Sequence, residues 1–166
     1  MDELREVSEK CVKLLSQRGL TIAFAESCTG GLCAKALTDV SGASSVFECG
    51  VVSYSGRIKN KILGVSREIL DEYGEVSSQT AEAMARGAAE ISGADIGVGI
   101  TGIAGPTGET KTKKVGLIYL SVFFEGKTYT EMLELYESSF DREKRRVFTA
   151  SRAFRNVIEI LQKRGS

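Results

Sequence analysis

Three side chains with a nucleophilic oxygen or sulfur atom stand together in the stretch AESCTGG, residues 25–31. They are Ser27, Cys28 and Thr29, which follow the short apolar run TIAFA and precede a helical pattern. A helix N-terminus offers free backbone N–H groups and positive potential, which suit a developing oxyanion. Ser27 and Cys28 are therefore both candidate nucleophiles. The alternative is a tight strand-to-helix turn in which Thr29 only caps the helix.

Histidine is absent from all 166 residues. This excludes a Ser-His-Asp triad, a Cys-His pair and every zinc site built on histidine. A lysine is then a natural base for a serine, provided that burial or a nearby cation lowers its pKa from about 10.4. Lys59 is the candidate, with Tyr54 nearby in the stretch SYSGRIK, residues 53–59. The alternative is that Lys59 is an ordinary solvated helix residue.

A glycine-rich loop, TGIAGPTG at residues 101–108, follows a predicted buried strand. Glycines at intervals of three let backbone N–H groups converge on an anion or a carbonyl. Ligands of open α/β sheets bind beyond the carboxyl ends of the strands, where this loop begins. The loop is therefore either a ligand-binding element or a plain glycine-rich surface loop.

Two further patterns have competing explanations. GVGITG, residues 97–102, matches the spacing GxGxxG. We do not expect a dinucleotide site there, because the glycines alternate inside a strand instead of opening a helix, and we expect a helix to pack on them. In FDREKRR, residues 140–146, Asp141 is a predicted N-cap, and Arg142, Arg145 and Arg146 either bind phosphate or form a solvated helix face.

The elements that must position these residues alternate along the first half of the chain. Apolar periodicity and turn residues predict helices at 3–17, 31–38, 56–63, 66–73, 77–91 and 141–163, with Ser78 resembling a cap of the 77–91 helix. They predict strands at 21–25, 47–54, 95–101, 115–124 and 128–136, the last two as a hairpin around Glu125 and Gly126. This order favours a single α/β domain over residues 1–166 with a mixed sheet.

Composition restricts the class of protein. Lys+Arg and Asp+Glu balance at 22 each, so a nucleic-acid partner is not expected. No apolar run has the ~18 residues of a membrane span, and the polar N-terminus does not resemble a signal peptide. The four cysteines have neither zinc-ribbon nor CxxC spacing. We expect free thiols in a cytoplasmic protein.

Taken together and in this order, the motifs resemble one family closely, the CinA C-terminal domain. The matching stretches are AESCTGG, YSGRIK at 54–59, LGV at 63–65, SSQTAEAMARGA at 77–88, GITGIAGPTG at 99–108, VGLIY at 115–119 and DREKRR at 141–146. Active members of this family are nicotinamide mononucleotide (NMN) deamidases. In many members the domain follows a molybdopterin-binding-like domain, so this chain resembles a stand-alone form.

The resemblance implies a three-layer α/β/α sandwich with a mixed, mostly parallel sheet, often assembled as a homo-oligomer. It implies hydrolysis of NMN to nicotinic acid mononucleotide and ammonia, without metal or cofactor, which recycles a by-product of bacterial DNA ligation toward NAD. Ser27 is then the nucleophile, Lys59 the general base and Tyr54 a neighbour that positions or relays the proton. The residues implied to hold the nucleotide and the oxyanion are Thr29, Gly30, Gly31, Thr101, Gly102, Ala104, Gly105 and Arg142. The charge of Arg142 is also expected to help keep Lys59 neutral.

Two departures from the family pattern lie beside the loop. Glu109 replaces a glycine and Lys114 replaces a proline. An added acid would weaken phosphate binding if its side chain pointed inward. Three alternatives remain open: a non-catalytic interaction module related to competence, an amidase for another amide, and a cysteine enzyme that uses Cys28.

Overall fold

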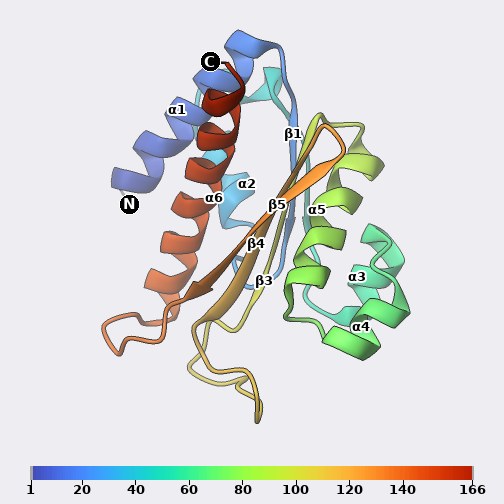
Figure 1. Ribbon diagram of the computed structural model, residues 1–166. Coiled ribbons are helices and arrows are strands. Elements are labelled where there is room, and N and C mark those ends of the chain that lie inside the picture. The colour runs from blue at the N-terminus through green and yellow to red at the C-terminus, as the bar shows by residue number, and fades with distance from the viewer. Residues whose placement is uncertain (1, 166) are drawn as a thin grey trace.

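A five-stranded sheet forms the centre of the chain in the computed structural model, which describes residues 2–165 (Figure 1). The strands are β1 (Ile22–Glu26), β2 (Phe47–Val52), β3 (Ile96–Gly102), β4 (Leu117–Phe124) and β5 (Lys127–Glu134). The helices are α1 (Asp2–Arg18), α2 (Leu32–Thr38), α3 (Gly56–Leu63), α4 (Arg67–Tyr73), α5 (Ser78–Ser92) and α6 (Arg142–Arg164), with a 3-10 turn η1 (Ala43–Ser45). Each predicted helix and strand is present, with its ends shifted by a few residues at most.

The strand order is β2-β1-β3-β4-β5. Strand β1 pairs in parallel with β2 and β3, whereas β4 is antiparallel to both β3 and β5. The sheet is therefore mixed, as predicted, with two parallel and two antiparallel pairs. Among the described residues, no helix is long and apolar enough to cross a membrane.

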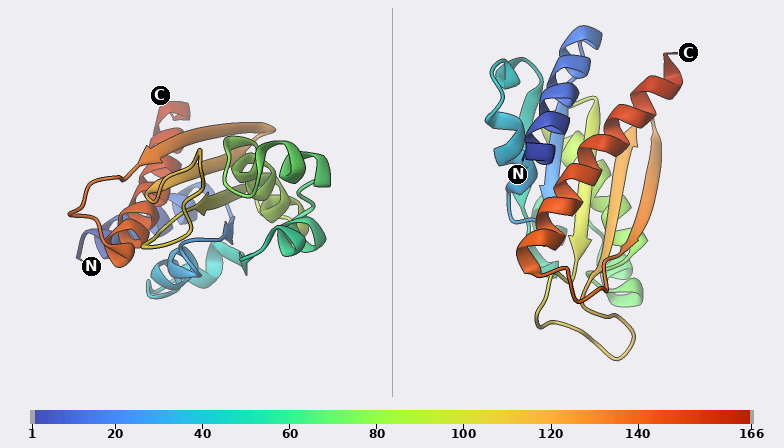
Figure 2. Two further views of the ribbon diagram at one scale, coloured as in Figure 1. Left: turned by 90° about the horizontal axis from the view of Figure 1, so that it is seen from below. Right: turned by 90° about the vertical axis from the view of Figure 1, so that its left-hand side faces the viewer.

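Helices cover both faces of the sheet, which gives the expected three layers (Figure 2). Helices α1, α2 and α6 lie on one face, and α3, α4 and α5 lie on the other. Strand β1 serves both layers because successive side chains point to opposite faces. Ile22 and Phe24 belong to the large core on the α6 side, and Ala23 and Ala25 to a smaller one on the α5 side.

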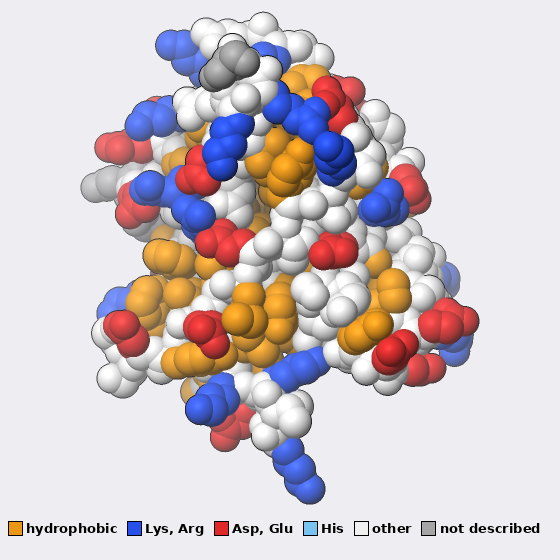
Figure 3. Space-filling model, in the orientation of Figure 1, with side chains coloured by type: hydrophobic (Ala, Val, Ile, Leu, Met, Phe, Trp, Pro, Cys, Tyr) orange, Lys and Arg blue, Asp and Glu red, His pale blue; other side chains and the backbone are white. Residues whose placement is uncertain are grey.

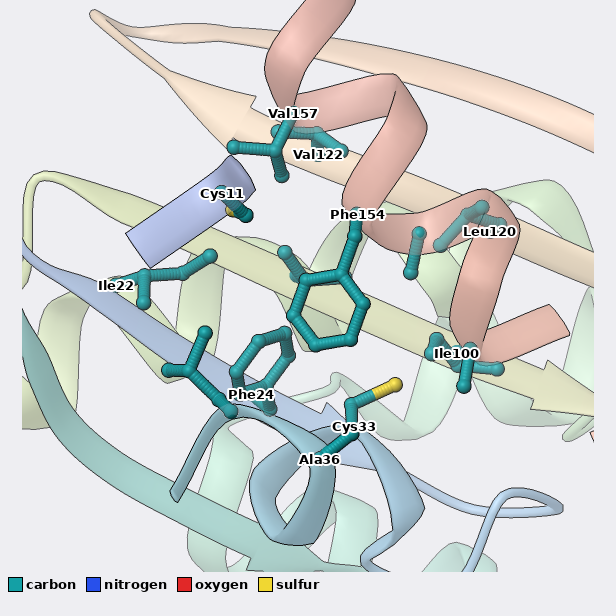
Figure 4. Close-up of a cluster of buried hydrophobic side chains, with 14 of the residues drawn as sticks. Cys11, Ile22, Phe24, Cys33, Ala36, Ile100, Leu120, Val122, Phe154 and Val157 are labelled. Carbon is teal, nitrogen blue, oxygen red and sulfur yellow. The ribbon is translucent and has the colours of Figure 1, made fainter. Parts of the chain in front are cut away.

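The larger core is built from aromatic and branched side chains (Figure 4). Phe24 of β1 and Phe154 of α6 meet edge to face with ring centroids 5.8 Å apart. Aromatic pairs prefer this geometry. Cys33 of α2 and Cys11 of α1 are fully buried in the same cluster. This packing fixes α2 and α6 against the strand that leads into AESCTGG.

Two glycines of β3 allow helix α5 to approach the sheet closely. A Cβ atom on Gly97 would lie 1.9 Å from the carbonyl oxygen of Ala85, and one on Gly99 would lie 2.2 Å from that of Ala81. Both distances are far below van der Waals contact, so only glycine fits. Gly97 and Gly99 therefore serve helix packing, as predicted, whereas a Cβ atom on the third glycine of GVGITG, Gly102, would meet Ile118 of β4. The cap of α5 is Ser77, whose Oγ accepts from the N–H of Thr80, and not Ser78 as expected.

Candidate active site

The carboxyl ends of the three parallel strands meet at one edge of the sheet, at the lower end of Figure 1. Ser27 follows β1, Ser53 and Tyr54 follow β2, and the 103–116 loop follows β3. Backbone hydrogen bonds tie these exits together: the N–H of Ser27 donates to the carbonyl of Ile100, and the N–H of Ser53 to that of Glu26. The sheet register thus brings stretches distant in sequence to one place.

Ser27 and Lys59 are in direct contact. The Nζ of Lys59 donates to the Oγ of Ser27 at 3.0 Å and to the carbonyl oxygen of Ser53 at 2.8 Å. Lys59 is only 1% exposed although it lies on a surface helix, because its side chain points from α3 under the strand ends. When the amine is neutral, its lone pair is placed to accept the Ser27 proton while one N–H still donates to Ser53.

Burial lowers the pKa of Lys59 below its ordinary value of 10.5, because the charged ammonium loses hydration. The negative charge of Glu75 opposes this shift, and Cys28 opposes it to a lesser extent. Arg142 is not among the groups that shift this pKa, so its expected role in keeping Lys59 neutral is wrong. The neutral form of Lys59, which can accept a proton, is favoured by dehydration rather than by a neighbouring cation.

A buried carboxylate, that of Glu26, fixes the turn around Ser27. Its Oε2 accepts from the N–H groups of Gly31 and Cys33, both at 3.1 Å, and its Oε1 accepts from that of Ala34 at 2.9 Å. Glu26 is 1% exposed. It caps the N-terminus of α2, a function usually performed by Ser, Thr, Asp or Asn at the N-cap itself. The residue next to Ser27 is thereby locked to the helix that follows.

Replacing Glu26 by alanine should destabilise the fold strongly. Three N–H groups, one buried and two part-buried, would lose their acceptor, and leaving them unsatisfied costs about 3 kcal/mol in total by typical values. Denaturant unfolding of Glu26→Ala measures this loss. Glu48→Ala is the matched control because Glu48 is an exposed acid on the neighbouring strand β2. Equal stability of the two variants would contradict the capping role.

The Glu26 contacts correct two expectations about the turn. Thr29 does not cap α2: the N-cap position is Gly31, and the buried Thr29 Oγ1 has no hydrogen-bond partner within residues 2–165. The first helical N–H groups are also not free for an oxyanion, since Glu26 occupies those of Gly31, Cys33 and Ala34. A carboxylate from the preceding strand therefore occupies the N–H groups that an oxyanion would need.

The three arginines of DREKRR have different positions. Arg142 donates to the carbonyl of Gly105 at 2.6 Å and to the hydroxyl of Tyr54 at 2.9 Å, so it bridges the loop and the β2 exit. Arg145 is buried and donates to two backbone carbonyls, and Arg146 donates to the carbonyl of Thr29. Of the three, only Arg142 faces the site. Arg145 and Arg146 are hydrogen-bonded to backbone carbonyls and so help to fix the backbone. Asp141 caps α6, as predicted.

A cavity of about 230 Å³ opens beside Ser27 and Lys59. Of the predicted site residues, it is lined by Ser27, Tyr54, Lys59, Thr101, Gly102, Ala104, Gly105 and Arg142. Thr29, Gly30 and Gly31 do not line it. The cavity is therefore lined by a hydroxyl–amine pair, a glycine-rich loop and an arginine.

Tyr54 is 60% exposed and its hydroxyl accepts from Arg142. The hydrogen bonds of Ser27 and Lys59 do not include Tyr54 in the part of the chain that the structure describes. Its place on the cavity wall suits contact with a ligand more directly than a proton relay.

Neither departure from the family pattern enters the cavity. Glu109 is exposed and does not line it. Lys114 lies over the ring of Tyr136, 5.9 Å from its centroid. Figure 3 shows basic side chains at the lower end of the molecule, where the 103–116 loop protrudes. The position of Glu109 therefore does not support the expectation that it weakens phosphate binding in the cavity.

The thiol of Cys28 is poorly suited to nucleophilic attack. Burial raises its pKa to about 12 from an ordinary 9.0, and the charge of Glu26 adds to this, while Lys59 and Arg146 oppose it weakly. A reactive cysteine requires a lowered pKa and access to solvent, since the thiolate is the nucleophile. Cys28 is 4% exposed and meets neither condition.

Thiol alkylation of the folded protein should therefore leave its catalytic activity within about twofold of the untreated value. Brief treatment with iodoacetamide at pH 7, followed by an activity assay and peptide mass mapping, tests this. The half-buried Cys49 serves as an internal control for reagent action. Rapid inactivation with modification at Cys28 would revive the cysteine mechanism.

Sequence reasoning missed two acids at this site. Glu26 gave a partial signal, because an acid directly before a glycine-rich helix start is a capping candidate. Glu75 gave none, since it follows α4 in a segment with no motif of its own. The Oε1 of Glu75 accepts from the N–H of Gly56 at 2.7 Å, and Glu75 lines the cavity.

Known proteins resemble this chain in sequence and in fold. The family model described as the CinA C-terminal domain matches residues 4–161. A CinA-like protein of Kosmotoga olearia is 51% identical over 129 residues, which are 78% of this chain and 31% of that protein. The crystal structure of a competence/damage inducible protein from Agrobacterium tumefaciens has a TM-score of 0.91 at 37% identity and covers 96% of both chains. A CinA superfamily protein from Klebsiella pneumoniae has a TM-score of 0.91 at 29% identity, covering 96% of this chain and 98% of its own.

The chain spans about a third of the length of the curated relatives that it matches. The solved structures, in contrast, match it over nearly their whole length.

Proposed function

This chain belongs to the CinA C-terminal domain family, and from that premise we propose that it is a metal-independent amidase that converts NMN and water to nicotinic acid mononucleotide and ammonia. The observation that carries the proposal is the 3.0 Å contact between Ser27 Oγ and the buried Nζ of Lys59 at the end of a ligand-sized cavity. A hydroxyl paired with a dehydrated amine is a known variant of the serine nucleophile.

The first half of the reaction transfers the acyl group to Ser27. Neutral Lys59 takes the hydroxyl proton as Ser27 Oγ bonds to the carboxamide carbon, which places a negative charge on the amide oxygen. The C–N bond then breaks, and Lys59 returns the proton to the departing nitrogen, which leaves as ammonia. In the second half Lys59 deprotonates water, which attacks the ester carbon. The bond between that carbon and Ser27 Oγ then breaks, and Lys59 returns the proton to Ser27 Oγ, which releases the acid product and restores both residues.

The oxyanion needs donors other than the N–H groups taken by Glu26. The N–H of Cys28 is suited, because it directly follows the nucleophile, lines the cavity and donates to no other residue among those described. The N–H groups of Ala104 and Gly105 in the loop are further candidates, because these residues line the cavity and their N–H groups donate to no other residue among those described. Arg142, which also lines the cavity, is the cation suited to the substrate phosphate.

The pH dependence of the rate should follow Lys59. Only the neutral amine takes a proton, so kcat/KM should rise with pH through the pKa of Lys59 and level off above it. Because burial lowers that pKa, the pH at which kcat/KM reaches half of its maximum should lie below 10.5. Initial rates with NMN between pH 5 and 10 measure the profile. A rate that falls across this range would contradict a lysine base.

A substrate comparison tests the proposal itself. Purified protein is incubated in EDTA with NMN, free nicotinamide or nicotinamide riboside, and ammonia is measured enzymatically. We expect release from NMN far above release from the two compounds without phosphate, because Arg142 has no partner on them. Release from nicotinamide alone would indicate another amidase. No release by a folded protein would favour the non-catalytic interaction module.

A further inference from the structure

Glu75 is the only acid among the described residues that line the cavity; the charged side chains beside it are Lys59 and Arg142. Although Glu75 is exposed to solvent, its segment is held from three directions. Its Oε1 accepts from the N–H of Gly56 at 2.7 Å, and its carbonyl accepts from the hydroxyl of Thr101 at 2.6 Å. The ammonium of Lys113 donates to the carbonyls of Tyr73 and Val76, on either side of it, at 2.7 and 2.5 Å.

These contacts fix the carboxylate near the catalytic end of the cavity. Its partner Gly56 is the first residue of α3, the helix that carries Lys59, and Glu75 lines the same cavity as Lys59 and Ser27. Of the neighbouring charges, that of Glu75 also acts most strongly on the pKa of Lys59. Arg142 bridges Tyr54 at the β2 exit and Gly105 of the loop. The cavity therefore presents one acid and one arginine besides Lys59, and each of the two is held by hydrogen bonds to other residues.

We propose that Glu75 is a specificity-determining residue that selects a positively charged pyridinium ring over a neutral ring. The inference rests on the proposed function, which places the substrate carboxamide at Ser27. In NMN only two ring carbons separate the carboxamide carbon from the charged ring nitrogen. A ring seated at Ser27 thus holds its cation near the anchored carboxylate, while the phosphate extends toward Arg142.

The charge of Glu75 also compensates for a conflict in the site. A protonated Lys59 would repel the cationic ring, and even the neutral amine gives the ring no counter-charge. The carboxylate supplies one while it remains hydrogen-bonded to Gly56. The reduced nucleotide, 1,4-dihydronicotinamide mononucleotide, has the same atoms for Arg142 but a neutral ring, so it lacks this attraction.

The test compares the two nucleotides by calorimetry in a Ser27→Ala background, where neither is turned over. We expect the oxidised form to bind about tenfold more tightly than the reduced form, and Glu75→Gln to bring the ratio close to one. Glutamine keeps the acceptor for Gly56 and removes only the charge. Glu72→Gln is the control, because Glu72 is an exposed acid of the same segment outside the cavity lining, and it should keep the tenfold ratio.

The outcomes separate this inference from the proposed function. Turnover of NMN by the unmodified chain, with a binding ratio that Glu75→Gln leaves unchanged, would overturn the role of Glu75 alone. Equal affinity for the oxidised and reduced nucleotides in the Ser27→Ala protein that retains Glu75 would also overturn the role of Glu75. Failure of NMN both to bind and to release ammonia would overturn the proposed function and the inference with it. A ratio that collapses in Glu75→Gln and persists in Glu72→Gln supports both.

Discussion

Ser27→Ala should abolish ammonia release from NMN while leaving the nucleotide bound. Removal of a nucleophile that acts together with its base lowers kcat on the order of a thousandfold or more. The substitution deletes one oxygen at a site that is 8% exposed, so the fold and the rest of the cavity should persist. Rates measured by coupled ammonia assay and affinity measured by calorimetry would show a loss in kcat without a matching loss in binding.

The control is Ser45→Ala, which removes a hydroxyl from the 3-10 turn η1, where Ser45 is exposed and does not line the cavity. It should retain wild-type kcat. A Ser27→Ala variant that still turns over NMN within tenfold of the wild type would exclude Ser27 as the nucleophile. The buried Lys59 would then have to activate water directly.

Lys59→Met and Lys59→Arg should both lose activity, for different reasons. Methionine has no basic nitrogen, and arginine keeps its proton at every pH in the assay range, so neither can accept the Ser27 proton. General base catalysis typically contributes about 10²–10⁴-fold, which sets the expected fall in kcat. Lys61→Met is the matched control, because Lys61 lies on the same helix and is exposed.

The stability of Lys59→Met gives a second, independent readout. Burial lowers the pKa of Lys59, so the folded chain resists a proton that the unfolded chain binds. The wild type therefore loses stability as the pH falls from 10.5 through the lowered pKa, and the penalty is complete below it. Methionine carries no such penalty. Denaturant unfolding at pH 7 should show Lys59→Met at least as stable as the wild type, and a variant that is inactive because it is unfolded would contradict this account.

The sequence predicted the fold and the pairing of Ser27 with Lys59 more completely than the rest of the site. Periodicity located each strand, and the ends of strands that stop shortly before Ser27 and Tyr54 must meet when the strands are parallel neighbours. The contact between Ser27 and Lys59 follows from that topology once α3 packs beneath the strand ends. The glycines of β3 were also predictable, because alternation within a strand indicates close packing.

The electrostatic details were less accessible. The capping of α2 by Glu26 depends on a side chain from the preceding strand reaching past Thr29, and a local capping rule favours the nearer hydroxyl. The place of Glu75 depends on long-range bonds to Gly56 and Thr101, which no short motif encodes. The cause of the lowered Lys59 pKa depends on burial, which is a property of the folded chain.

The most direct test of the central claim is interception of the acyl-enzyme with hydroxylamine. An ester of Ser27 must be attacked by hydroxylamine in competition with water, which converts part of the product to the hydroxamate of nicotinic acid mononucleotide. We predict hydroxamate by mass spectrometry from wild-type protein and NMN, in proportion to hydroxylamine, and none above the enzyme-free background with Ser27→Ala. Steady ammonia release with the acid as the sole product would contradict a covalent Ser27 intermediate.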